Sequence, residues 1–403
     1  MRLPAGVRDW LPHELARKRD IELVIRAVFG RWAYEEVQTP TFERFDVLEK
    51  GLGHELTEQA YRFADRRATA LALRPEMTTP IARLVSTRMR EVPLPLRLSY
   101  VTPVFRYYDQ PQEGRLRELT QAGVELIGSH GIDADAEALF MAIETLDEIG
   151  LRDAQFDIND ASVVDGILDG VGLSAEAAIG AKTWMKERNI VALRTLEKPT
   201  LVEFAMTRGG RDAIELARSV CRTPVSIQAL DRLSCLLERA GALGYSERIH
   251  IDFALLRDLE YYTGFIFEGY VPDIGFALCG GGRYDSLLPR FGFDVPAVGW
   301  TAGVERLLIA LERRGKHVVR RRQRIDVLVS GSDVVAARER AAGNVVRFAS
   351  GEVEESALLE DARAHHIPRV VIATNGTVRE VFVAPEAETR LPTQTIAGKW
   401  EAK

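Results

Sequence analysis

The sequence predicts an α+β fold: an antiparallel sheet flanked by helices, interrupted by a helical insertion and followed by a small C-terminal α/β domain. Three observations predict this fold. Two apolar runs, Leu96–Phe105 and Leu119–Ile127, flank a polar loop with proline and glycine, as the strands of a long hairpin do. From residue 163 to 247 strand signals vanish and alanine and leucine dominate. From residue 325 onward, short strand signals alternate with helical ones.

The first part of the sheet domain, residues 1–162, contains further elements around the hairpin. Residues 14–32 carry apolar side chains at helical spacing with charges between them, and this predicts an amphipathic helix. A strand signal at 36–38 ends at a proline. Residues 135–149 predict a second amphipathic helix, and 156–158 a core strand.

Residues 163–247 form the predicted helical insertion, because glycines punctuate short segments with helical patterns. The sheet domain then resumes in residues 248–315. Its expected strands are Ile249–Phe253, Tyr261–Glu268, Phe276–Leu278 and Val298–Thr301, followed by a helix at Val304–Arg314.

Residues 316–324 are rich in arginine and lack apolar periodicity, which favours a solvated linker over a nucleic-acid patch. The remaining segment, 325–403, predicts a small α/β domain with a largely parallel sheet. Its expected strands are 325–330, 345–348, 370–373 and 380–384, with helices at 333–342 and 355–365. This segment holds nine Lys and Arg against twelve Asp and Glu, a net charge of −3, and so lacks an overall basic field for RNA.

Composition limits the class of protein. The chain of 403 residues has room for two or three domains, and 46% hydrophobic with 28% charged residues is ordinary globular usage. The net charge of −6 gives no broad basic surface. The three cysteines lack metal-ligand spacing and are expected to be free thiols. The N-terminus has no apolar signal core, and no apolar run nears the length of a membrane span. We therefore expect a cytoplasmic protein with no membrane, metal or cofactor.

The hairpin carries the most informative side chains. Arg106 lies where its first strand enters the loop, and Gln121, Gly123 and Glu125 alternate along the second strand. Since strand side chains alternate between faces, these three residues share one face. An amide and a carboxylate on one strand face are costly in a dry core, so we expect them to line a polar cavity. Such a cavity suits a zwitterion with a ring donor.

Other segments add candidate residues whose plain structural interpretation is also open. Glu76 and Thr78 follow a proline and can face an ammonium group, although an isolated carboxylate is more often an exposed or ion-paired one. Tyr261 and Tyr262 follow Arg257, and a tyrosine pair alone is more often core. Three glycines precede Arg283 and Tyr284; they let the backbone approach a ligand closely, or mark only a turn. Arg306 suits phosphate oxygens, or a helix surface.

The chain resembles the catalytic core of histidyl-tRNA synthetase, a class II aminoacyl-tRNA synthetase, in separated segments. These are the opening LPAGVRD with LP after it, the segment Tyr34–Pro40, LRPEMT at Leu73–Thr78, Phe105–Gln121, LRDLEYYTGFIFE with CGGGRYD, and GWTAGVERL at Gly299–Leu307. The resemblance implies a class II synthetase-like antiparallel sheet and a homodimeric core. It implies a C-terminal domain in the place of the anticodon-binding domain.

The resemblance also assigns roles to individual side chains. It implies a histidine pocket in which Glu76, Thr78, Gln121 and Glu125 hold the amino and carboxylate groups, Arg257 assists the carboxylate and Tyr262 contacts the imidazole. The full expected histidine-binding set is Glu76, Thr78, Arg106, Gln121, Glu125, Arg257, Tyr261, Tyr262 and Tyr284. Arg106 and Arg306 resemble the arginines that hold ATP phosphates, and we expect a vestigial ATP site there.

Two departures from the synthetase pattern matter. The glutamate that accepts from the adenine amino group is replaced by Tyr107 or Tyr108, depending on where a one-residue insertion is placed. The glycine and aspartate that follow the arginine of the histidine segment are Asp258 and Glu260. We expect both changes to weaken ATP binding and adenylate formation while leaving an amino-acid pocket usable.

In details the chain is closer to the synthetase's paralogue family, the regulatory subunits of ATP phosphoribosyltransferase. These details are the opening LPAGVRDWLP, the run LRPEMTTPIARL and QAGVELIG. This resemblance implies a non-catalytic subunit that assembles with a short catalytic subunit for the first step of histidine biosynthesis, with L-histidine as feedback effector and tRNA unlikely as a partner. Two alternatives stay open: an active histidyl-tRNA synthetase, and a histidine-binding module for another partner.

Overall fold

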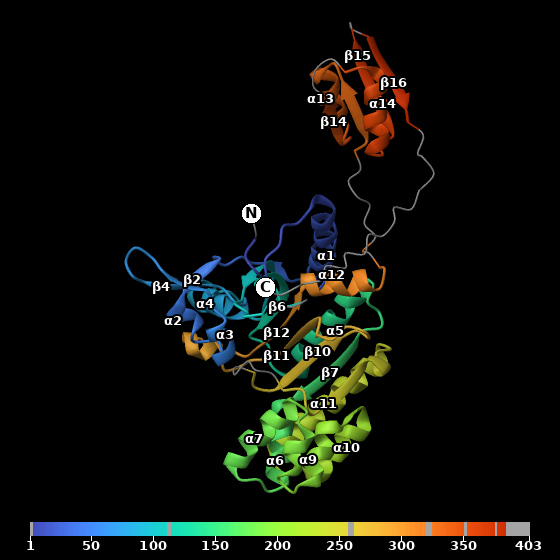
Figure 1. Cartoon of the computed structure of the whole chain (residues 1–403). Coiled ribbons are helices and arrows are strands. Elements are labelled where there is room, and N and C mark those ends of the chain that lie inside the picture. The colour runs from blue at the N-terminus through green and yellow to red at the C-terminus, as the bar shows by residue number, and fades with distance from the viewer. Residues whose placement is uncertain are drawn as a thin grey trace. The chain divides into compact units, whose positions relative to one another are not determined.

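The computed structural model describes residues 3–110, 114–256, 262–316, 318, 325–349, 353–374 and 377–383. The chain divides into two compact units, Met1–Val318 and Val319–Lys403 (Figure 1). Each unit has its own sheet and its own hydrophobic core. The boundary falls within the segment 316–324, for which the sequence predicts a linker.

The first unit is built on a sheet of nine strands, most of them antiparallel neighbours. In order across the sheet they are β1 (Glu35–Glu36), β5 (Leu96–Phe105), β6 (Glu118–Ile127), β12 (Ala297–Gly303), β11 (Cys279–Arg283), β10 (Phe265–Tyr270), β7 (Gln155–Asp160), β9 (Ile249–Asp252) and β8 (Arg208–Gly209). Only the β1–β5 and β7–β9 pairs are parallel in the part of the sheet that the structure describes. The predicted antiparallel sheet is confirmed, and so is its central hairpin, β5–β6.

One face of this sheet is covered by helices. They are α1 (Pro12–Arg31), α5 (Gly131–Ile149) and α12 (Val304–Arg313), which pack on each other and on the central strands (Figure 1). The ring of Phe29 on α1 meets that of Trp300 on β12 edge to face, with the ring centroids 5.7 Å apart. The periodic apolar residues that predicted these helices are therefore their sheet-facing sides.

Strand β6 divides its side chains between the two faces of the sheet. Ala122, Val124 and Leu126 are buried in the core under the helices. Because side chains alternate along a strand, Gln121 and Glu125 lie on the opposite face. The predicted sharing of one face by these polar residues is confirmed.

A second, three-stranded sheet and several short helices were not foreseen from the sequence. The sheet has the order β2 (Phe42–Arg44), β4 (Ala70–Leu73), β3 (Arg62–Ala64). The associated helices are α2 (Phe45–Leu48), α3 (His54–Glu58), α4 (Thr78–Arg88) and the 3₁₀ turn η2 (Leu288–Phe291). The strands have three or four residues each, too few for a periodic signal.

Between β7 and β9 the chain forms a group of helices at one end of the large sheet (Figure 1). They are α6 (Ala161–Gly170), α7 (Ala175–Lys186), α8 (Ile190–Arg194), α9 (Pro199–Met206), α10 (Arg211–Val220), α11 (Pro224–Ala242) and the 3₁₀ turn η1 (Ser246–Arg248). Ser174 and Thr223 cap α7 and α11 by accepting backbone N–H groups through their hydroxyls. The helical character predicted for 163–247 is thus present, with β8 as an unforeseen short strand.

The insertion is joined to the sheet by backbone pairing and by ion pairs. β8 pairs with β9 as the last strand of the sheet. Arg208 donates to Asp157 on β7 at 2.7 Å, and Arg188 donates to Asp252 at the end of β9. Burial raises the pKa of both aspartates, and the arginines oppose that shift. Both aspartates are largely buried, so each needs its arginine.

The second unit confirms the predicted small α/β domain. Its sheet has the order β14 (Val346–Ala349), β13 (Val327–Ser330), β15 (Arg369–Thr374), β16 (Thr377–Phe382). The first three strands are parallel and β16 is antiparallel to β15. Helices α13 (Asp333–Ala341) and α14 (Glu355–Ala364) connect the parallel strands.

Two strand predictions in the second half of the sheet had the wrong bounds. The strand expected at Tyr261–Glu268 begins only at Phe265, so Tyr262 precedes β10. The strand expected at Phe276–Leu278 lies instead at Cys279–Arg283, with the glycine triplet inside it. The glycine triplet hid this strand, because glycine weakens any strand signal. Here the glycines allow close packing: a Cβ on Gly281 would lie 2.7 Å from the Trp300 Cα.

Among the described helices, none is long and apolar enough to cross a membrane.

Candidate functional site

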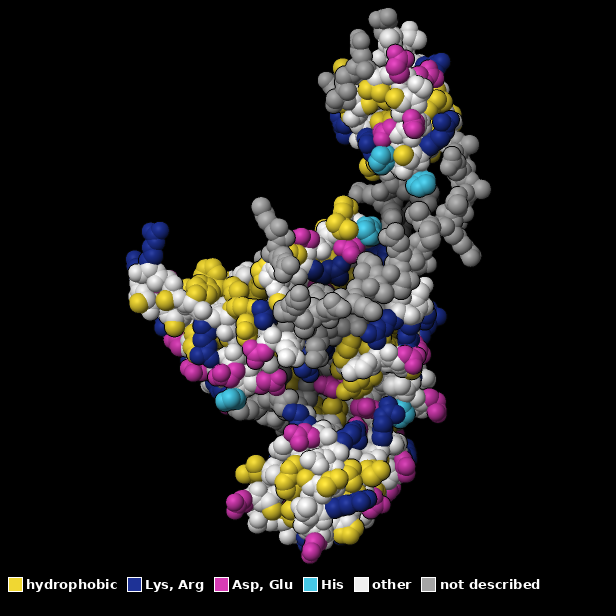
Figure 2. All heavy atoms as spheres, in the orientation of Figure 1, with side chains coloured by type: hydrophobic (Ala, Val, Ile, Leu, Met, Phe, Trp, Pro, Cys, Tyr) yellow, Lys and Arg dark blue, Asp and Glu magenta, His cyan; other side chains and the backbone are white. Residues whose placement is uncertain are grey.

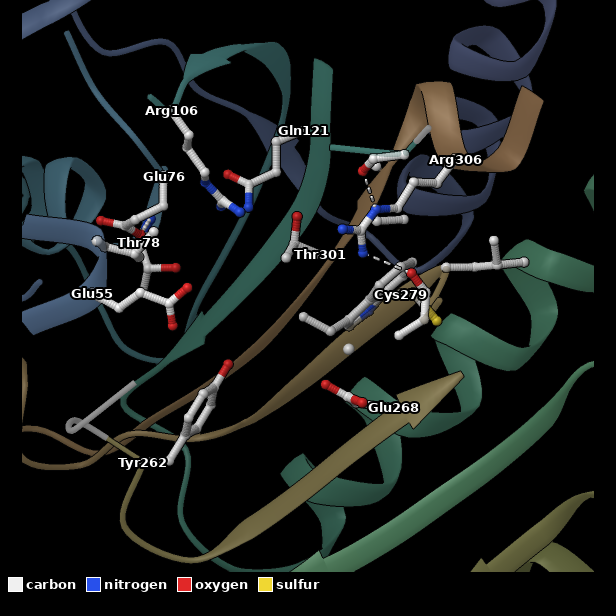
Figure 3. Close-up of a pocket in the computed structure, with 18 of the residues that line it drawn as sticks. Glu55, Glu76, Thr78, Arg106, Gln121, Tyr262, Glu268, Cys279, Thr301 and Arg306 are labelled. Atoms are coloured by element: carbon white, nitrogen blue, oxygen red, sulfur yellow. Dashed lines mark hydrogen bonds between the residues drawn. The ribbon is translucent and has the colours of Figure 1, made fainter. Parts of the chain in front are cut away.

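A cavity of about 500 Å³ lies on the face of the large sheet opposite the covering helices (Figure 3). Its walls come from β5, β6, β10, β11 and β12, from the segment before α4, and from the insertion. The predicted residues that line it are Glu76, Thr78, Arg106, Gln121, Glu125, Tyr262, Tyr284 and Arg306. Arg257 and Tyr261 lie outside the described residues. Segments far apart in the sequence thus meet in one polar cavity.

The strand register places the central polar residues. On β5, Thr102 pairs with Gln121 and Tyr100 with Gly123. A Cβ on Gly123 would lie 2.7 Å from Cζ of the Tyr100 ring, so only glycine leaves room for that ring over β6. The ring fills the floor of the cavity between Gln121 and Glu125.

Glu125 is a fully buried carboxyl surrounded by hydroxyl groups. Thr78 donates to its Oε1 at 2.9 Å, Tyr284 donates to its Oε2, and the Tyr100 hydroxyl lies 3.5 Å from Oε1. Burial raises the pKa of Glu125 to about 8; the donated hydrogen bonds oppose this rise, and the neighbouring Glu76 adds to it. Gly299 on β12 lies against this carboxyl and leaves space for it.

Glu76 caps the helix that follows it. Its carboxylate accepts the backbone N–H of Thr78 at 2.6 Å and that of Thr79 at 3.0 Å, at the N-terminus of α4. The positive end of the helix dipole also favours a carboxylate there. Burial raises the pKa of Glu76, while these N–H donors and Arg106 oppose the rise. Thr78 links the two carboxyls, because its N–H serves Glu76 and its hydroxyl serves Glu125.

The segment carrying Glu76 and Thr78 is anchored by the buried side chain of Arg74. Its guanidinium donates to the carbonyls of Thr39 at 2.7 Å, Pro40 at 3.1 Å and Pro103 at 3.0 Å, and to the Thr102 hydroxyl. Burial lowers the pKa of Arg74. Carbonyl dipoles therefore solvate this buried cation.

Gln121 presents an unused acceptor. It is 6% exposed, and its Oε1 has no hydrogen-bond partner in the described structure. Gln121 and Arg106 extend toward the same region of the cavity (Figure 3). Among the described residues, Arg106 donates only through its Nε, to the Pro75 carbonyl at 2.7 Å. Since buried polar atoms are nearly always paired, the Gln121 oxygen suits a donor on a ligand.

Arg306 lies at the other end of the cavity, and two of its three guanidinium nitrogens donate to backbone carbonyls. Nε donates to the Gly114 carbonyl and Nη1 to the Ala277 carbonyl, both at 2.9 Å (Figure 3). The guanidinium also lies over the Phe276 ring, 5.3 Å from its centroid. Burial, together with Arg106 and Arg115, lowers the pKa of Arg306. Phosphate binding would therefore have to compete with these bonds.

The two candidate replacements for the adenine-binding glutamate are separated by the structure. Tyr108 lines the cavity. Tyr107 does not; it packs edge to face on Tyr61, with Arg117 over its ring at 4.4 Å. Tyr108 is thus the one of these two candidates whose side chain reaches the cavity, and it carries no carboxylate.

Tyr284 is positioned by the arginine that precedes it. Arg283 donates to Asp135 on α5 at 2.9 Å and to the Gly131 carbonyl at 3.1 Å, which ties the end of β11 to the start of α5. Across the cavity, the hydroxyl of Tyr262 points into the open space (Figure 3). A Cβ on Gly282 would lie 2.9 Å from the Tyr262 ring, so the glycine triplet also accommodates this tyrosine.

Sequence reasoning missed several residues of the cavity wall. They are Glu55, Tyr100, Arg115, Lys186, Arg188, Asp252, Glu268 and Thr301. Tyr100 could have been predicted from the sequence, because the hairpin register places it opposite a glycine. Lys186 and Arg188 belong to the insertion, and no local pattern indicates that the insertion reaches this cavity.

Comparisons with known proteins show what this architecture is similar to. A family model described as histidyl-tRNA synthetase matches residues 6–307, which is most of the chain. An ATP phosphoribosyltransferase regulatory subunit of Moorella thermoacetica is 44% identical over 319 residues, covering 77% of this chain and 82% of that protein. One from Syntrophotalea carbinolica is 34% identical over 98% of this chain and 96% of its own. The chain belongs to the family of ATP phosphoribosyltransferase regulatory subunits.

Solved structures agree with this assignment to the regulatory-subunit family, which shares the histidyl-tRNA synthetase core. A Bacillus halodurans protein titled an ATP phosphoribosyltransferase regulatory subunit/histidyl-tRNA synthetase is 30% identical with a TM-score of 0.78, covering 89% of this chain and 96% of that one. A histidyl-tRNA synthetase from Nostoc is 21% identical with a TM-score of 0.77, which shows a shared fold. The class II synthetase-like fold predicted from the sequence is thereby confirmed.

Proposed function

We propose that this chain is a non-catalytic regulatory subunit that activates a short ATP phosphoribosyltransferase catalytic subunit and binds L-histidine as a feedback effector. Its membership of the regulatory-subunit family supports the role. One observation carries the proposal further: the cavity holds the side chains of Glu76, Gln121 and Glu125 together, whereas Tyr107 and Tyr108, the candidate replacements for the adenine-binding glutamate, carry no carboxylate. The side chains of the cavity match the charged groups of an amino acid better than they match ATP.

The groups of histidine match the cavity in charge. An ammonium suits the Glu76 carboxyl at the start of α4, and a carboxylate suits the Arg106 N–H groups that donate to none of the described residues. The Gln121 oxygen is a further acceptor for the ammonium. No cofactor is part of this proposal.

Charge supports a protein partner over tRNA. The helical insertion, 163–247, holds eleven Lys and Arg and eleven Asp and Glu, and both signs are interspersed over its visible surface (Figure 2). The C-terminal segment 325–403 is net negative. A tRNA-binding surface gains most of its affinity from basic residues on phosphates, and neither segment supplies a net excess.

We place the chain in a homodimeric core within a hetero-oligomer. Large apolar side chains stay exposed on α1 and on the small sheet, among them Leu15, Leu23, Phe42 and Phe63. A cytoplasmic location is supported by the free thiols of its cysteines.

The deciding experiment measures the phosphoribosyltransferase activity of a short catalytic subunit from the same organism, with and without this chain and with and without histidine. In parallel, histidine-dependent pyrophosphate exchange is measured with this chain alone. We expect stimulation that histidine suppresses, and no exchange. Exchange without stimulation would identify an active synthetase instead.

A variant pair locates the effect in the cavity. Gln121→Ala removes the unpaired acceptor, and we expect stimulation to lose its sensitivity to histidine. Tyr107→Phe, outside the cavity, is the control and should behave as the parent. Equal histidine sensitivity in the parent, Gln121→Ala and Tyr107→Phe would show that the effector binds outside this cavity.

A further inference from the structure

A second cluster of charged side chains lies where the large sheet meets α5 and the helical insertion. It consists of Asp135 on α5, Asp160 at the end of β7, Arg232 on α11 and Arg283 at the end of β11. Both aspartates are 1% exposed. A carboxylate buried this deeply is strongly destabilising without a counter-charge, so each aspartate needs an arginine.

Hydrogen bonds fix the pairing within this cluster. Arg283 donates from Nε to Asp135 at 2.9 Å, and its Nη2 lies 2.7 Å from the same oxygen. Arg232 donates to Oδ2 of Asp160 at 2.9 Å. The other oxygen of Asp160 accepts the Ser162 N–H at 2.9 Å and caps α6. Asp160 therefore takes its counter-charge from α11 while it caps the first helix of the insertion.

The two ion pairs lie close enough to compete. A Cβ on Gly264 would lie 3.6 Å from Oδ2 of Asp160 and 3.8 Å from Cδ of Arg283, so both side chains approach the same glycine. Burial raises the pKa of Asp135, and both Arg283 and Arg232 oppose this rise. Without Arg232, Arg283 would be the remaining arginine of the cluster for two buried carboxyls.

Arg283 also joins this cluster to the cavity. The next residue, Tyr284, has its side chain on the opposite face of the sheet and donates to Glu125. The carbonyl of Arg283 accepts the N–H of Thr263 at 2.8 Å, and Thr263 follows Tyr262 in the chain. Both cavity tyrosines are thus neighbours of this one backbone contact, so a displacement of Arg283 would move both.

We propose that Arg232, on the helical insertion, is a positioning residue for the cavity. It holds Asp160, which leaves Arg283 paired with Asp135. Tyr284 then stays in place for the ligand. The inference rests on the proposed function, because the affinity for L-histidine reports the position of the cavity tyrosines. By linkage, a ligand that fixes these tyrosines also fixes α11 against the end of β7.

Matched substitutions on one helix test this role. Arg239, also on α11, pairs with the exposed Asp133 instead of a member of the cluster. In calorimetric titration, Arg232→Met should bind histidine about tenfold more weakly than the parent, and Arg239→Met should bind like the parent. Arg232→Lys keeps the charge and should recover most of the affinity. Parent-like affinity in Arg232→Met would overturn the proposal.

A second substitution separates positioning from a general loss of structure. Asp160→Asn keeps a capping side chain for α6 and removes the charge that draws Arg283 away. Added to Arg232→Met, it should restore histidine affinity to within about threefold of the parent. A double variant as weak as Arg232→Met would show that the two aspartates do not compete for Arg283, and the proposal would be wrong.

Hydrogen exchange of the parent protein provides a readout even if Arg232→Met does not fold. Bound histidine should slow the exchange of amides in the first turn of α6, beginning with Ser162, and around Arg232 on α11. Helix α14 of the second unit is the internal reference and should exchange at the same rate. Unchanged exchange in both α6 and α11 with histidine bound would contradict the coupling.

A measurement without ligand separates this inference from the proposed function. Arg232→Met and Tyr284→Phe are combined in a double-mutant cycle of urea unfolding. The combined loss in the folding equilibrium constant should be at least about fivefold smaller than the product of the separate losses, because Arg232→Met already releases Tyr284. Losses that simply multiply would overturn the coupling. A parent that binds no histidine, with coupling present in the cycle, would reject the effector role alone.

Discussion

Replacing Gly299 by alanine should disturb the cavity through a single added carbon. A Cβ there would lie 3.0 Å from Cδ of Glu125, and closer still to Oε2 and to the Val124 carbonyl of the neighbouring strand. The carboxyl would have to turn away from Tyr284 and Thr78, and β12 would have to shift from β6. Overpacking of this kind costs about 1–3 kcal/mol of folding stability.

The effect on ligand binding follows from the same displacement. Losing the two hydrogen bonds that orient Glu125 costs about 0.5–1.5 kcal/mol each, so histidine should bind about ten- to a hundredfold more weakly. Urea unfolding and calorimetric titration measure the two effects. The control is Gly30→Ala near the end of α1, where a Cβ meets nothing within 4 Å; it should stabilise by up to about 1 kcal/mol. Parent-like stability and affinity in Gly299→Ala would refute the contact on which this reasoning depends.

Three further predictions test separate parts of the site. Gln121→Ala should weaken histidine binding about tenfold while changing the unfolding midpoint little, because no described residue donates to its Oε1; a large loss of stability would show that this oxygen has a protein partner. Arg74→Met should cost about 3 kcal/mol or more in urea unfolding, since it leaves buried carbonyls unsatisfied; a loss below about 1 kcal/mol would show that they find other donors. Glu125→Gln should become increasingly stable relative to the parent as pH rises from about 5 to 8. In that range the folded parent holds a proton that the unfolded chain has released, so its stability falls by up to about 1.4 kcal/mol per pH unit; parallel stability–pH curves would reject the raised pKa.

Much of the fold was predictable because long elements carry long patterns. The hairpin β5–β6 has ten residues in each strand, and its alternation identified the cavity face before any coordinates. The three helices over the sheet and the alternating elements of the C-terminal unit were identified for the same reason. The small sheet β2–β4–β3 escaped, because its strands are too short for periodicity to emerge.

Site residues were predictable where a single strand or motif carries them. They were not predictable where contacts between distant segments decide the position and hydrogen bonds of a side chain. Gln121 and Glu125 share a face by strand geometry alone. The engagement of Arg306 with two carbonyls depends on Gly114 and Ala277, which are distant in sequence. The glycine triplet was interpreted as a place where a ligand approaches the backbone, or as a turn, whereas packing against Trp300 and Tyr262 accounts for Gly281 and Gly282. Backbone spacing cannot anticipate which ring will lie above a glycine.

The attachment of the helical insertion has a consequence for how the chain can be divided. The insertion supplies the outermost strand of the large sheet and the arginines that neutralise Asp157 and Asp252. Excising it would leave a raw sheet edge and two buried acids without counter-charges. If a ligand displaced this segment, β9 would have to move with it, because β8 is hydrogen-bonded to β9. The helical segment and the sheet therefore form one mechanical body, and a truncated core lacking residues 163–247 should not be expected to fold as an independent module.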